Sequence, residues 1–127
     1  MAVSEDTVAE QIARLTDCRK WTSKREIFFL PRIIQPEETI LGLTSALFRE
    51  HKWLVTVTDR RIIFLRQKLM EGIQDEIALS DLEKVESRTG LLFGEIHLLT
   101  TRGESLTIGS IMKKDVQSLT SIISSHL

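Results

Sequence analysis

The sequence predicts a mainly β fold with helices at both ends, in which about seven strands form an antiparallel meander. Three observations support this fold class. Short runs of β-branched and apolar residues, separated by turn signals, fill the chain from about residue 39 to residue 110. No helical pattern lies between these runs, which argues against alternating strand–helix units. Helical spacing of apolar residues occurs only before and after them.

Size and composition fit one cytoplasmic domain with a hydrophobic core. The chain has 127 residues, of which 42% are hydrophobic and 28% are charged. The net charge of −1 excludes the basic footprint of a nucleic-acid-binding domain. A single cysteine, Cys18, cannot form an internal disulfide and suits a reducing compartment. We expect neither a signal peptide nor a membrane span, because no stretch is long and apolar enough.

The N-terminal region, residues 1–23, is predicted to be a helical extension of the main domain, residues 24–127. Thr7 and Glu10 stand at capping-box spacing and begin a predicted helix over residues 7–19. Its apolar stripe comprises Val8, Ile12 and Leu15. A second short helix is predicted at about 24–30, ending before Pro31, because proline lacks an N–H and crowds the preceding turn.

Seven strands are expected after a break at Pro36. Their sequences begin at residues 39, 53, 61, 73, 82, 94 and 104 and read TILGLTSALF, WLVTVT, RIIFLRQ, IQDEIAL, LEKVESR, GEIHLLTT and ESLTIGS. Arg102-Gly103 is a favourable turn between the last two, because glycine tolerates positive φ. A C-terminal helix with Ser110 as N-cap follows. Its apolar stripe should pack on the sheet and comprises Met112, Val116, Leu119, Ile123 and Leu127.

The hairpin VTVTDRRIIFLRQK contains two adjacent arginines at its turn. A turn at Asp59-Arg60 places Val57 opposite Ile62 and Val55 opposite Phe64. One face is then a core face, with Arg66 at its rim resting on Trp53; its members are Trp53, Val55, Val57, Ile62 and Phe64. Arg60 becomes a solvated tip.

The other face of this hairpin is a candidate interaction face, formed by Leu54, Arg61, Ile63 and Leu65. Its aliphatic side chains need a cover. The N-terminal helices, a second copy of the chain or another protein would each provide one.

Charge is segregated along the sequence. Residues 49–68 carry a net +4, and residues 71–86 carry a net −5. Two interpretations are open. Such a dipolar surface steers self-association or docking with a partner. Alternatively, neighbouring strands of opposite charge satisfy each other across the sheet.

Several segments together resemble the bacterial pleckstrin-homology-like domains, in particular the YokE-like group, over about residues 24–127. These segments are LPRIIQPEETI, VTVTDRRIIFL, IALSDLEKVES, GEIHLLTTRGESLTIGSI and the final helix. The resemblance implies a seven-stranded, strongly bent antiparallel sheet or barrel capped by the C-terminal helix.

Eukaryotic members of this fold bind phosphoinositide headgroups with basic residues around the first hairpin loop. The corresponding loop here is Phe48-Arg49-Glu50-His51-Lys52. The candidate anionic-ligand patch therefore comprises Arg49, His51, Lys52, Arg60 and Lys68. Glu50 interrupts the basic residues of this loop.

Catalysis finds little support in the sequence. The three histidines, His51, His97 and His126, do not have metal-ligand spacing, and no nucleophile or phosphate-binding motif is present. We therefore expect no catalytic residues, no metal and no cofactor. The leading hypothesis is a module that binds another protein or copies of itself, and not nucleic acid. The alternative is peripheral binding to a membrane or an anionic ligand.

Overall fold

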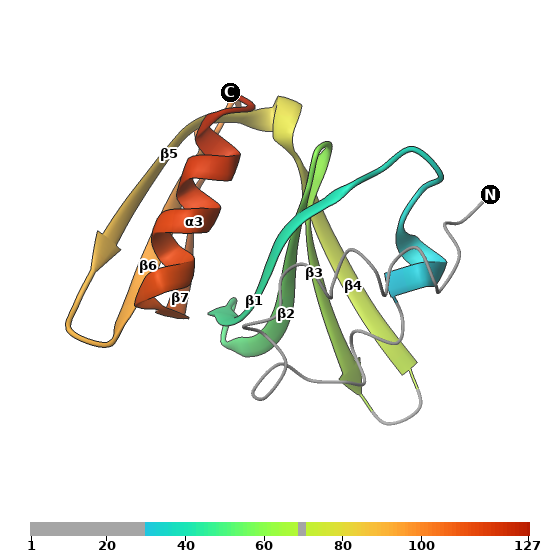
Figure 1. Cartoon of the computed structure of the whole chain (residues 1–127), viewed down its shortest axis with the longest axis horizontal. Helices are drawn as coiled ribbons and strands as arrows, with labels where there is room; N and C mark the ends of the chain where they lie inside the picture. The colour runs from blue at the N-terminus through green and yellow to red at the C-terminus, as the bar shows by residue number, and fades with distance from the viewer. Residues whose placement is uncertain (1–29, 69–70) are drawn as a thin grey trace.

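The computed structural model describes residues 30–68 and 71–127, and in these residues seven strands form one antiparallel sheet in the order β4-β3-β2-β1-β7-β6-β5 (Figure 1). The elements are β1 Ile40–Phe48, β2 His51–Thr58, β3 Arg61–Lys68, β4 Glu71–Ala78, the 3-10 helix η2 Leu79–Asp81, β5 Leu82–Thr89, β6 Phe93–Thr100, β7 Ser105–Met112 and the helix α3 Lys113–Ser124. The predicted fold class is confirmed. The helix predicted over 7–19 lies outside the described residues.

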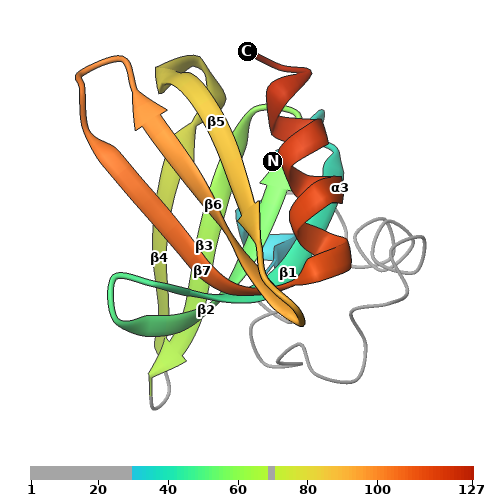
Figure 2. The ribbon, with the colours of Figure 1, turned by 90° about the vertical axis from the view of Figure 1, so that its left-hand side faces the viewer.

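The sheet bends into two groups of strands that diverge from η2 (Figure 1). Strands β1–β4 form one group and β5–β7 the other, and their junction is narrow: β1 pairs with β7 only at Leu47 and Gly109. Helix α3 lies alongside β5 and β6 and reaches β1, so it covers the inner side of the bend (Figure 2). No helix in the described part of the chain is both long and apolar enough to cross a membrane.

The main core fills the space between the two groups of strands and α3. The predicted hairpin register is confirmed, with Val57 opposite Ile62 and Val55 opposite Phe64. The predicted core face is confirmed as well, since all five of its side chains are buried in one cluster: Trp53, Val55, Val57, Ile62 and Phe64. The guanidinium of Arg66 lies 5.0 Å from the centroid of the Trp53 ring, as predicted for a cation–π contact at the rim.

A second, smaller core lies on the outer side of β1–β3. It buries Leu54, Ile63 and Leu65, three members of the candidate interaction face. The side chains packed around them come from the same chain and include Leu30, Ile34, Ile40 and Leu43. The sequence predicted that one of three partners covers this face, and in the structure the cover is the segment of the same chain that precedes β1. A partner cannot reach these three side chains in this structure.

The segment before β1 differs from its prediction at Pro31. Residues 30–33 are helical, so the proline lies within the helix. The backbone N–H of Ile34 donates to the carbonyl oxygen of Leu30 at 3.0 Å, which closes a turn without any N–H from Pro31. The predicted break at Pro36 is confirmed by a turn, in which the N–H of Glu38 donates to the carbonyl of Gln35 at 3.0 Å.

Helix α3 begins later than predicted. Ser110 is not its N-cap: it belongs to β7, which continues to Met112, and has a φ of 52°. Met112 occupies the cap position and makes no side-chain cap hydrogen bond. The apolar stripe does pack on the sheet, since Val116, Leu119 and Ile123 are buried. The hydroxyl of Thr44 on β1 donates to the carboxylate of Asp115 at 3.0 Å and holds the first turn of the helix.

Candidate functional site

The two adjacent arginines of the β2–β3 turn have different environments. Arg61 lies opposite the buried carboxylate of Glu38, whose side chain is 0% exposed. Its Nε donates to Oε2 of Glu38 at 2.9 Å and its Nη2 donates to Oε1 at 2.8 Å, so the pair is bidentate. Arg61 also donates to the carbonyl of Ile33 at 2.8 Å and to Glu76 at 2.6 Å. All these contacts join strands to the preceding segment or to each other, so Arg61 is a structural residue.

Ionisation of this pair is maintained by its hydrogen bonds. Burial acts to raise the pKa of Glu38, but hydrogen bonds from Arg61, Thr58 and the backbone N–H of Gln35 outweigh it, and the pKa is lowered from its usual 4.5. The hydrogen bond to Glu38 is the main cause that raises the pKa of Arg61. Both groups are therefore charged at neutral pH, and neither is free to bind a ligand.

Arg60 lies at the exposed tip, as predicted, and contacts the loop before β1. Its Nη1 donates to the side-chain oxygen of Gln35 at 2.9 Å, and its Nη2 lies 3.8 Å from the carboxylate of Glu37. Together with residues 32–37 it lines a shallow hollow. This hollow belongs to the loop that covers the outer core.

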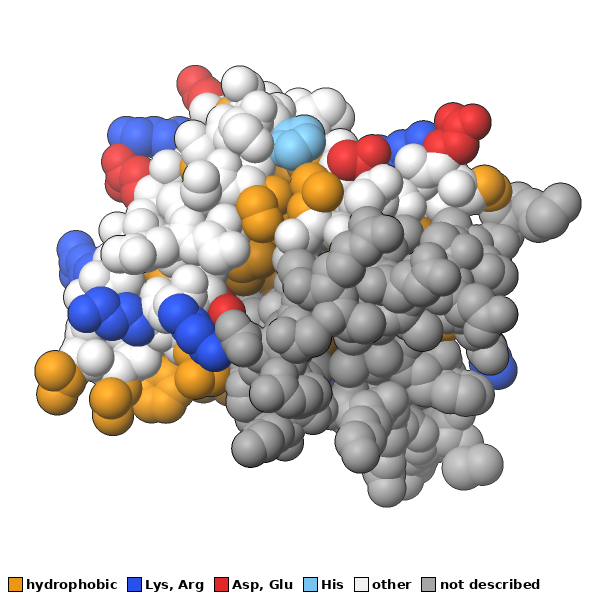
Figure 3. Space-filling view, in the orientation of Figure 1, with side chains coloured by type: hydrophobic (Ala, Val, Ile, Leu, Met, Phe, Trp, Pro, Cys, Tyr) orange, Lys and Arg blue, Asp and Glu red, His pale blue; other side chains and the backbone are white. Residues whose placement is uncertain are grey.

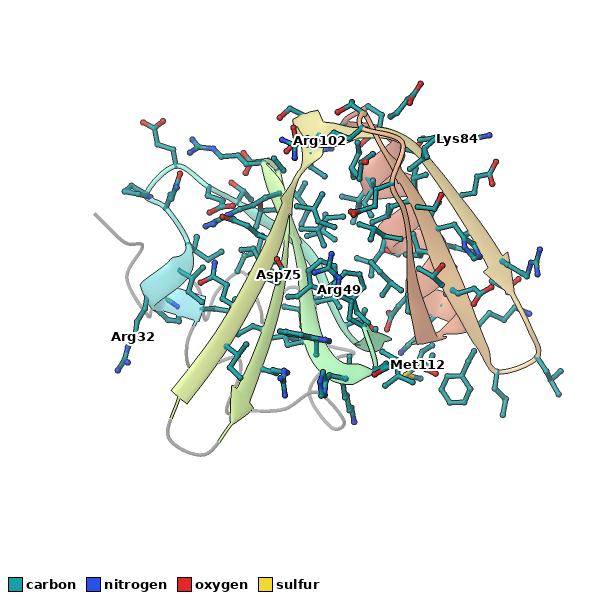
Figure 4. The ribbon with its side chains drawn as sticks, turned by 180° about the vertical axis from the view of Figure 1, so that it is seen from behind. Arg32, Arg49, Asp75, Lys84, Arg102 and Met112 are labelled. Atoms are coloured by element: carbon teal, nitrogen blue, oxygen red, sulfur yellow. The ribbon has the colours of Figure 1, made fainter. Side chains whose placement is uncertain are left out.

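Within the candidate anionic-ligand patch, Arg60 lies apart from Arg49, His51 and Lys52. Arg49 and Arg60 stand at opposite ends of β2, a strand of eight residues that spans about 25 Å. Arg49 contacts the carboxylate of Asp75 on β4 at 2.8 Å and lies 4.9 Å from the Phe48 ring centroid (Figure 4). His51 and Lys52 are exposed near the β1–β2 turn, and the Lys68 side chain lies outside the described residues. Arg60 is therefore too far from Arg49 to bind the same small ligand.

The charge segregation resolves partly into contacts between strands. Arg49 pairs with Asp75, and Arg61 pairs with Glu76, so two cations of the basic segment contact two carboxylates of β4. This favours the interpretation that neighbouring strands of opposite charge satisfy each other. The exposed pairs contribute little to stability, roughly 0–1 kcal/mol each.

His97 is the histidine with the most organised surroundings. On the outer face of β6 and β7, its Nε2 lies 2.9 Å from the Glu95 carboxylate and its Nδ1 lies 3.2 Å from the Thr107 hydroxyl. A hydroxyl, an imidazole and a carboxylate in this order resemble a catalytic triad. However, His97 and Thr107 face each other across paired strands, so the nearby N–H groups belong to the sheet ladder and are not arranged as an oxyanion hole. No group of three metal-ligating side chains occurs in the described ranges 30–68 and 71–127.

Exposed apolar side chains gather at one end of the molecule, which we call the apolar end: Leu47, Leu91, Leu92 and Phe93. Leu91 and Leu92 lie in the turn between β5 and β6, and Phe93 begins β6; Leu91 is 90% exposed, Leu92 69% and Phe93 55%. Leu47, at the end of β1, is 46% exposed. Figure 3 shows hydrophobic side chains at the lower left, where the β5–β6 turn lies, with Lys and Arg side chains beside them.

The β5–β6 turn is held in place by main-chain hydrogen bonds. The N–H of Gly90 donates to the carbonyl of Phe93 at 2.7 Å, and the N–H of Lys113 donates to the carbonyl of Leu92 at 3.1 Å. The second bond ties the turn to the first residue of α3. The turn therefore presents its leucines on a fixed backbone, which lowers the entropy cost of docking.

A groove of about 490 Å³ adjoins this turn, and its lining is mainly apolar. It lies across the narrow β1–β7 junction and is lined by Ser45, Ala46, Leu47, Lys52, Phe93, Ser110 and Met112. Met112 marks this end of the molecule in Figure 4. An apolar hollow with a few polar groups is the usual form of a binding site.

Sequence reasoning missed the apolar end. The predicted strands end at Arg88 and resume at Gly94 with Thr89-Gly90 as the turn signal, and Leu91, Leu92 and Phe93 are assigned to no element. The signal was present in the run Leu91-Leu92-Phe93, because three large apolar residues at a turn have no face to bury. The groove itself depends on the β1–β7 junction, which joins residues about 60 positions apart and gives no local signal.

Comparisons with known proteins agree with the fold. A family model described as Bacterial PH domain matches residues 34–125. Among solved structures, the C-terminal domain of an unknown protein from Leishmania infantum is similar, with a TM-score of 0.52 and 13% sequence identity. The similarity covers 70% of this chain and 84% of that one, and at this identity it concerns the fold alone. The search of curated proteins found no match.

Proposed function

Because the chain belongs to the bacterial PH domain family, we propose that it is a non-catalytic binding module that docks a protein partner through the apolar end. The observation that carries this proposal is the exposure of Leu91, Leu92 and Phe93 on one fixed turn beside an apolar groove. Exposed apolar surface of this kind costs solubility unless a partner covers it, so it marks interaction sites.

The other surfaces support docking less well. Leu54, Ile63 and Leu65 are buried under the chain's own residues 30–43, so self-association through them would require this segment to leave. Anionic-ligand binding by Arg49 and Arg60 would have to break the contacts that these arginines make with Asp75 and with Gln35. We propose a cytoplasmic location, since the single cysteine of the sequence suits a reducing compartment.

A catalytic role for His97 is the second candidate. The imidazole lies on an open sheet face, where the groove that it lines also contains Lys84, Glu86 and Arg88. Lys84 and Glu86 pair with each other at 2.8 Å. An exposed ion pair of this kind is typical of a solvated strand face, so we propose no reaction at His97.

Affinity capture with matched variants tests the proposal. The full chain, the double variant Leu91→Ser/Leu92→Ser and the variant Leu127→Ser are used as baits in lysate of the native cells. Leu127 is a suitable control because it is also a large apolar residue, 48% exposed, and belongs neither to the apolar end nor to the lining of the groove. All three proteins should have the same circular dichroism spectrum, because the substituted side chains are on the surface.

The proposal predicts proteins that are captured by the full chain and by Leu127→Ser but are lost from the double variant. Identical captured sets for all three baits would contradict docking through the apolar end. Capture of no protein by the full chain at low salt would contradict it as well. Purified partner and wild-type chain should then bind each other in isothermal calorimetry, which excludes indirect capture.

A further inference from the structure

The groove at the apolar end is hollow enough for one or two side chains. Its volume of about 490 Å³ lies between Leu47 and Lys52 on one hairpin and Phe93 and Met112 on the other group of strands. Methionine adapts its shape to different apolar guests. A hollow of this size suits a single anchoring side chain from an extended or helical segment, whereas a flat surface would not enter it.

Polar groups in the groove suit a peptide. Ser45 and Ser110 line it with their hydroxyl-bearing side chains, and Ser110 is exposed with a φ of 52°. A hydroxyl donates and accepts hydrogen bonds, so both can pair with the main chain of a bound segment. An apolar hollow with two such hydroxyls favours a guest that has backbone amides next to its apolar side chain.

Cations surround the apolar end on several elements. Lys52 lines the groove opposite Leu47, with which it is paired in the β1–β2 register. Lys113 and Lys114 follow Met112 at the start of α3, and both are exposed. Arg88 precedes the β5–β6 turn by two residues and is exposed as well.

The acidic residues that the structure describes in the same region do not line the groove. Asp115 accepts a hydrogen bond from Thr44 at 3.0 Å, and Glu95 pairs with His97 at 2.9 Å. Glu50, at the β1–β2 turn, is not part of the groove lining. Among the described residues that line the groove, Lys52 is the one charged side chain, so the lining has positive charge although the whole chain has a net charge of −1.

The positions of Lys113 and Lys114 are unfavourable for α3 itself. Both lie in its first turn, where the helix macrodipole is positive, and Asp115 is the acidic residue of that turn. Their two positive charges add to the positive potential of the helix N-terminus. At this terminus the N–H of Lys113 donates to the carbonyl of Leu92 in the β5–β6 turn. Anionic groups next to the groove would be attracted by both.

A second copy of the chain is a poor occupant. A symmetric contact between two apolar ends would bring Lys52, Lys113 and Lys114 of both copies into one interface. Like charges at an interface disfavour that pairing. The charge and the shape therefore favour a different, acidic protein.

We propose that the groove of the apolar end binds a linear acidic segment of a partner protein, anchored by one large apolar side chain between Leu47, Phe93 and Met112. Carboxylates on either side of the anchor would lie near Lys52 and Lys113. This inference rests on the proposed function and specifies the chemistry of the partner. A single anchored segment is expected to bind weakly, with a Kd of order micromolar.

Peptide selection tests this proposal without prior identification of the partner. Random twelve-residue peptides displayed on phage are selected against the full chain, and enriched peptides are synthesised with a fluorescent label. Fluorescence anisotropy then measures their binding to wild type, Leu92→Ser, Phe93→Ser, Lys113→Glu/Lys114→Glu and the control Leu127→Ser. Circular dichroism checks that each variant is folded, and Leu92→Ser provides the mildest change if Phe93→Ser perturbs β6.

The expected result is a set of peptides with net negative charge and at least one large apolar residue. Their binding should weaken by about tenfold or more in the Leu92, Phe93 and Lys113/Lys114 variants, be unchanged in Leu127→Ser, and weaken as salt rises. If the peptides need Leu92 and Phe93 for binding but are neutral or basic, the inference of an acidic partner is overturned. The proposed docking function would then still stand. Equal binding by all variants would overturn both.

The absence of any enriched peptide would overturn the linear segment as occupant. Sedimentation with vesicles of phosphatidylcholine and phosphatidylglycerol forms the second arm of the test. Vesicle binding that requires Leu92 and Phe93, combined with no enriched peptide, would assign the apolar end to a lipid surface instead. Wild type that ignores these vesicles while binding acidic peptides supports the proposal.

Discussion

Arg61 and Glu38 form a bidentate ion pair between the β2–β3 turn and the segment that precedes β1, with donor–acceptor distances of 2.9 and 2.8 Å. The Thr58 hydroxyl donates a third hydrogen bond to the same carboxylate at 2.6 Å. Through Arg61 the outer core, in which Leu30 and Ile34 cover β1–β3, is tied to the sheet by polar contacts as well as by packing. This pair explains why the side chain of Arg61 is only 13% exposed whereas that of the adjacent Arg60 is 45% exposed.

Arg61→Leu should destabilise the chain strongly, while Arg60→Leu should not. The first variant leaves the buried Glu38 carboxylate without its cation, and we expect a loss of about 3 kcal/mol in the free energy of unfolding. Arg60 is exposed and makes only surface contacts, so its variant should stay within about 0.5 kcal/mol of wild type. Urea unfolding measures both. Similar losses for the two variants would contradict the assignment of Arg61 as the structural residue.

Removing both charges should cost less than removing Arg61 alone. In Glu38→Leu/Arg61→Leu no buried carboxylate remains unpaired, and the added aliphatic atoms lie beside the outer core. A double-mutant cycle should therefore give a coupling energy of about 1–3 kcal/mol. If the double variant were as unstable as the sum of the two single variants, Glu38 and Arg61 would be acting independently.

The stability of the wild type should depend on acid pH through Glu38. The pKa of its carboxyl is lower in the folded chain than its usual 4.5, so the unfolded chain takes up this proton first as the pH falls. The stabilisation is fully present above pH 4.5 and is lost as the pH falls through the lowered value. Wild type should accordingly keep its advantage over Glu38→Gln from neutral pH down to about pH 4.5 and lose it over the range of pH below 4.5. An advantage that stays constant over this range would rule out the lowered pKa.

Gly94→Ala should disrupt the contact between β5, β6 and α3. A Cβ at this position would lie 2.5 Å from the carbonyl oxygen of Arg88 and 3.0 Å from Cγ2 of Val116, and the first of these is main chain. We expect a loss of about 2–3 kcal/mol in the free energy of unfolding. Gly109→Ala is the matched control on β7, because a Cβ there meets nothing within 4 Å, and it should change stability by less than about 1 kcal/mol. Equal effects would contradict the close packing at Gly94.

Substitutions at the apolar end should leave the fold intact. Leu91→Ser/Leu92→Ser removes side chains that are mostly in water, so the midpoint of urea unfolding should shift by no more than the equivalent of about 0.5 kcal/mol. Aggregation at high concentration should decrease, because exposed apolar area is lost. A large loss of stability would show that these leucines belong to the core and not to a docking surface.

Local patterns in the sequence were sufficient for most of the sheet. Period-two alternation and the Asp59-Arg60 turn predicted the partners of Val55 and Val57 and the position of Arg66 over Trp53, because a turn fixes the register of the strands that it joins. The start of α3 was wrong at Ser110, since a good N-cap residue competes with a β7 strand that extends two residues further. Tertiary pairing overrode the local preference there.

The Glu38–Arg61 ion pair, the cover of the outer core and the groove all depend on contacts between residues far apart in the sequence, which no local pattern contains. The partner of Arg61 is Glu38, 23 residues away, and it was not identified from the sequence. The outer face of the hairpin was predicted to need a cover, and the ion pair and Leu30 show how the chain supplies one. The groove forms where β1 and β7 meet at Leu47 and Gly109, and only the folded chain brings these residues together.

Photo-crosslinking at the apolar end is the most direct test of the central claim that this end docks a protein. p-Benzoylphenylalanine is introduced at Leu92 or, as control, at Leu127, and the chain is irradiated in its native cells. Docking predicts one or a few discrete adducts of higher mass from position 92, absent from position 127 and identified by mass spectrometry. The claim would be contradicted if the chain with the crosslinker at position 92 formed no adduct, or if both positions gave the same adducts.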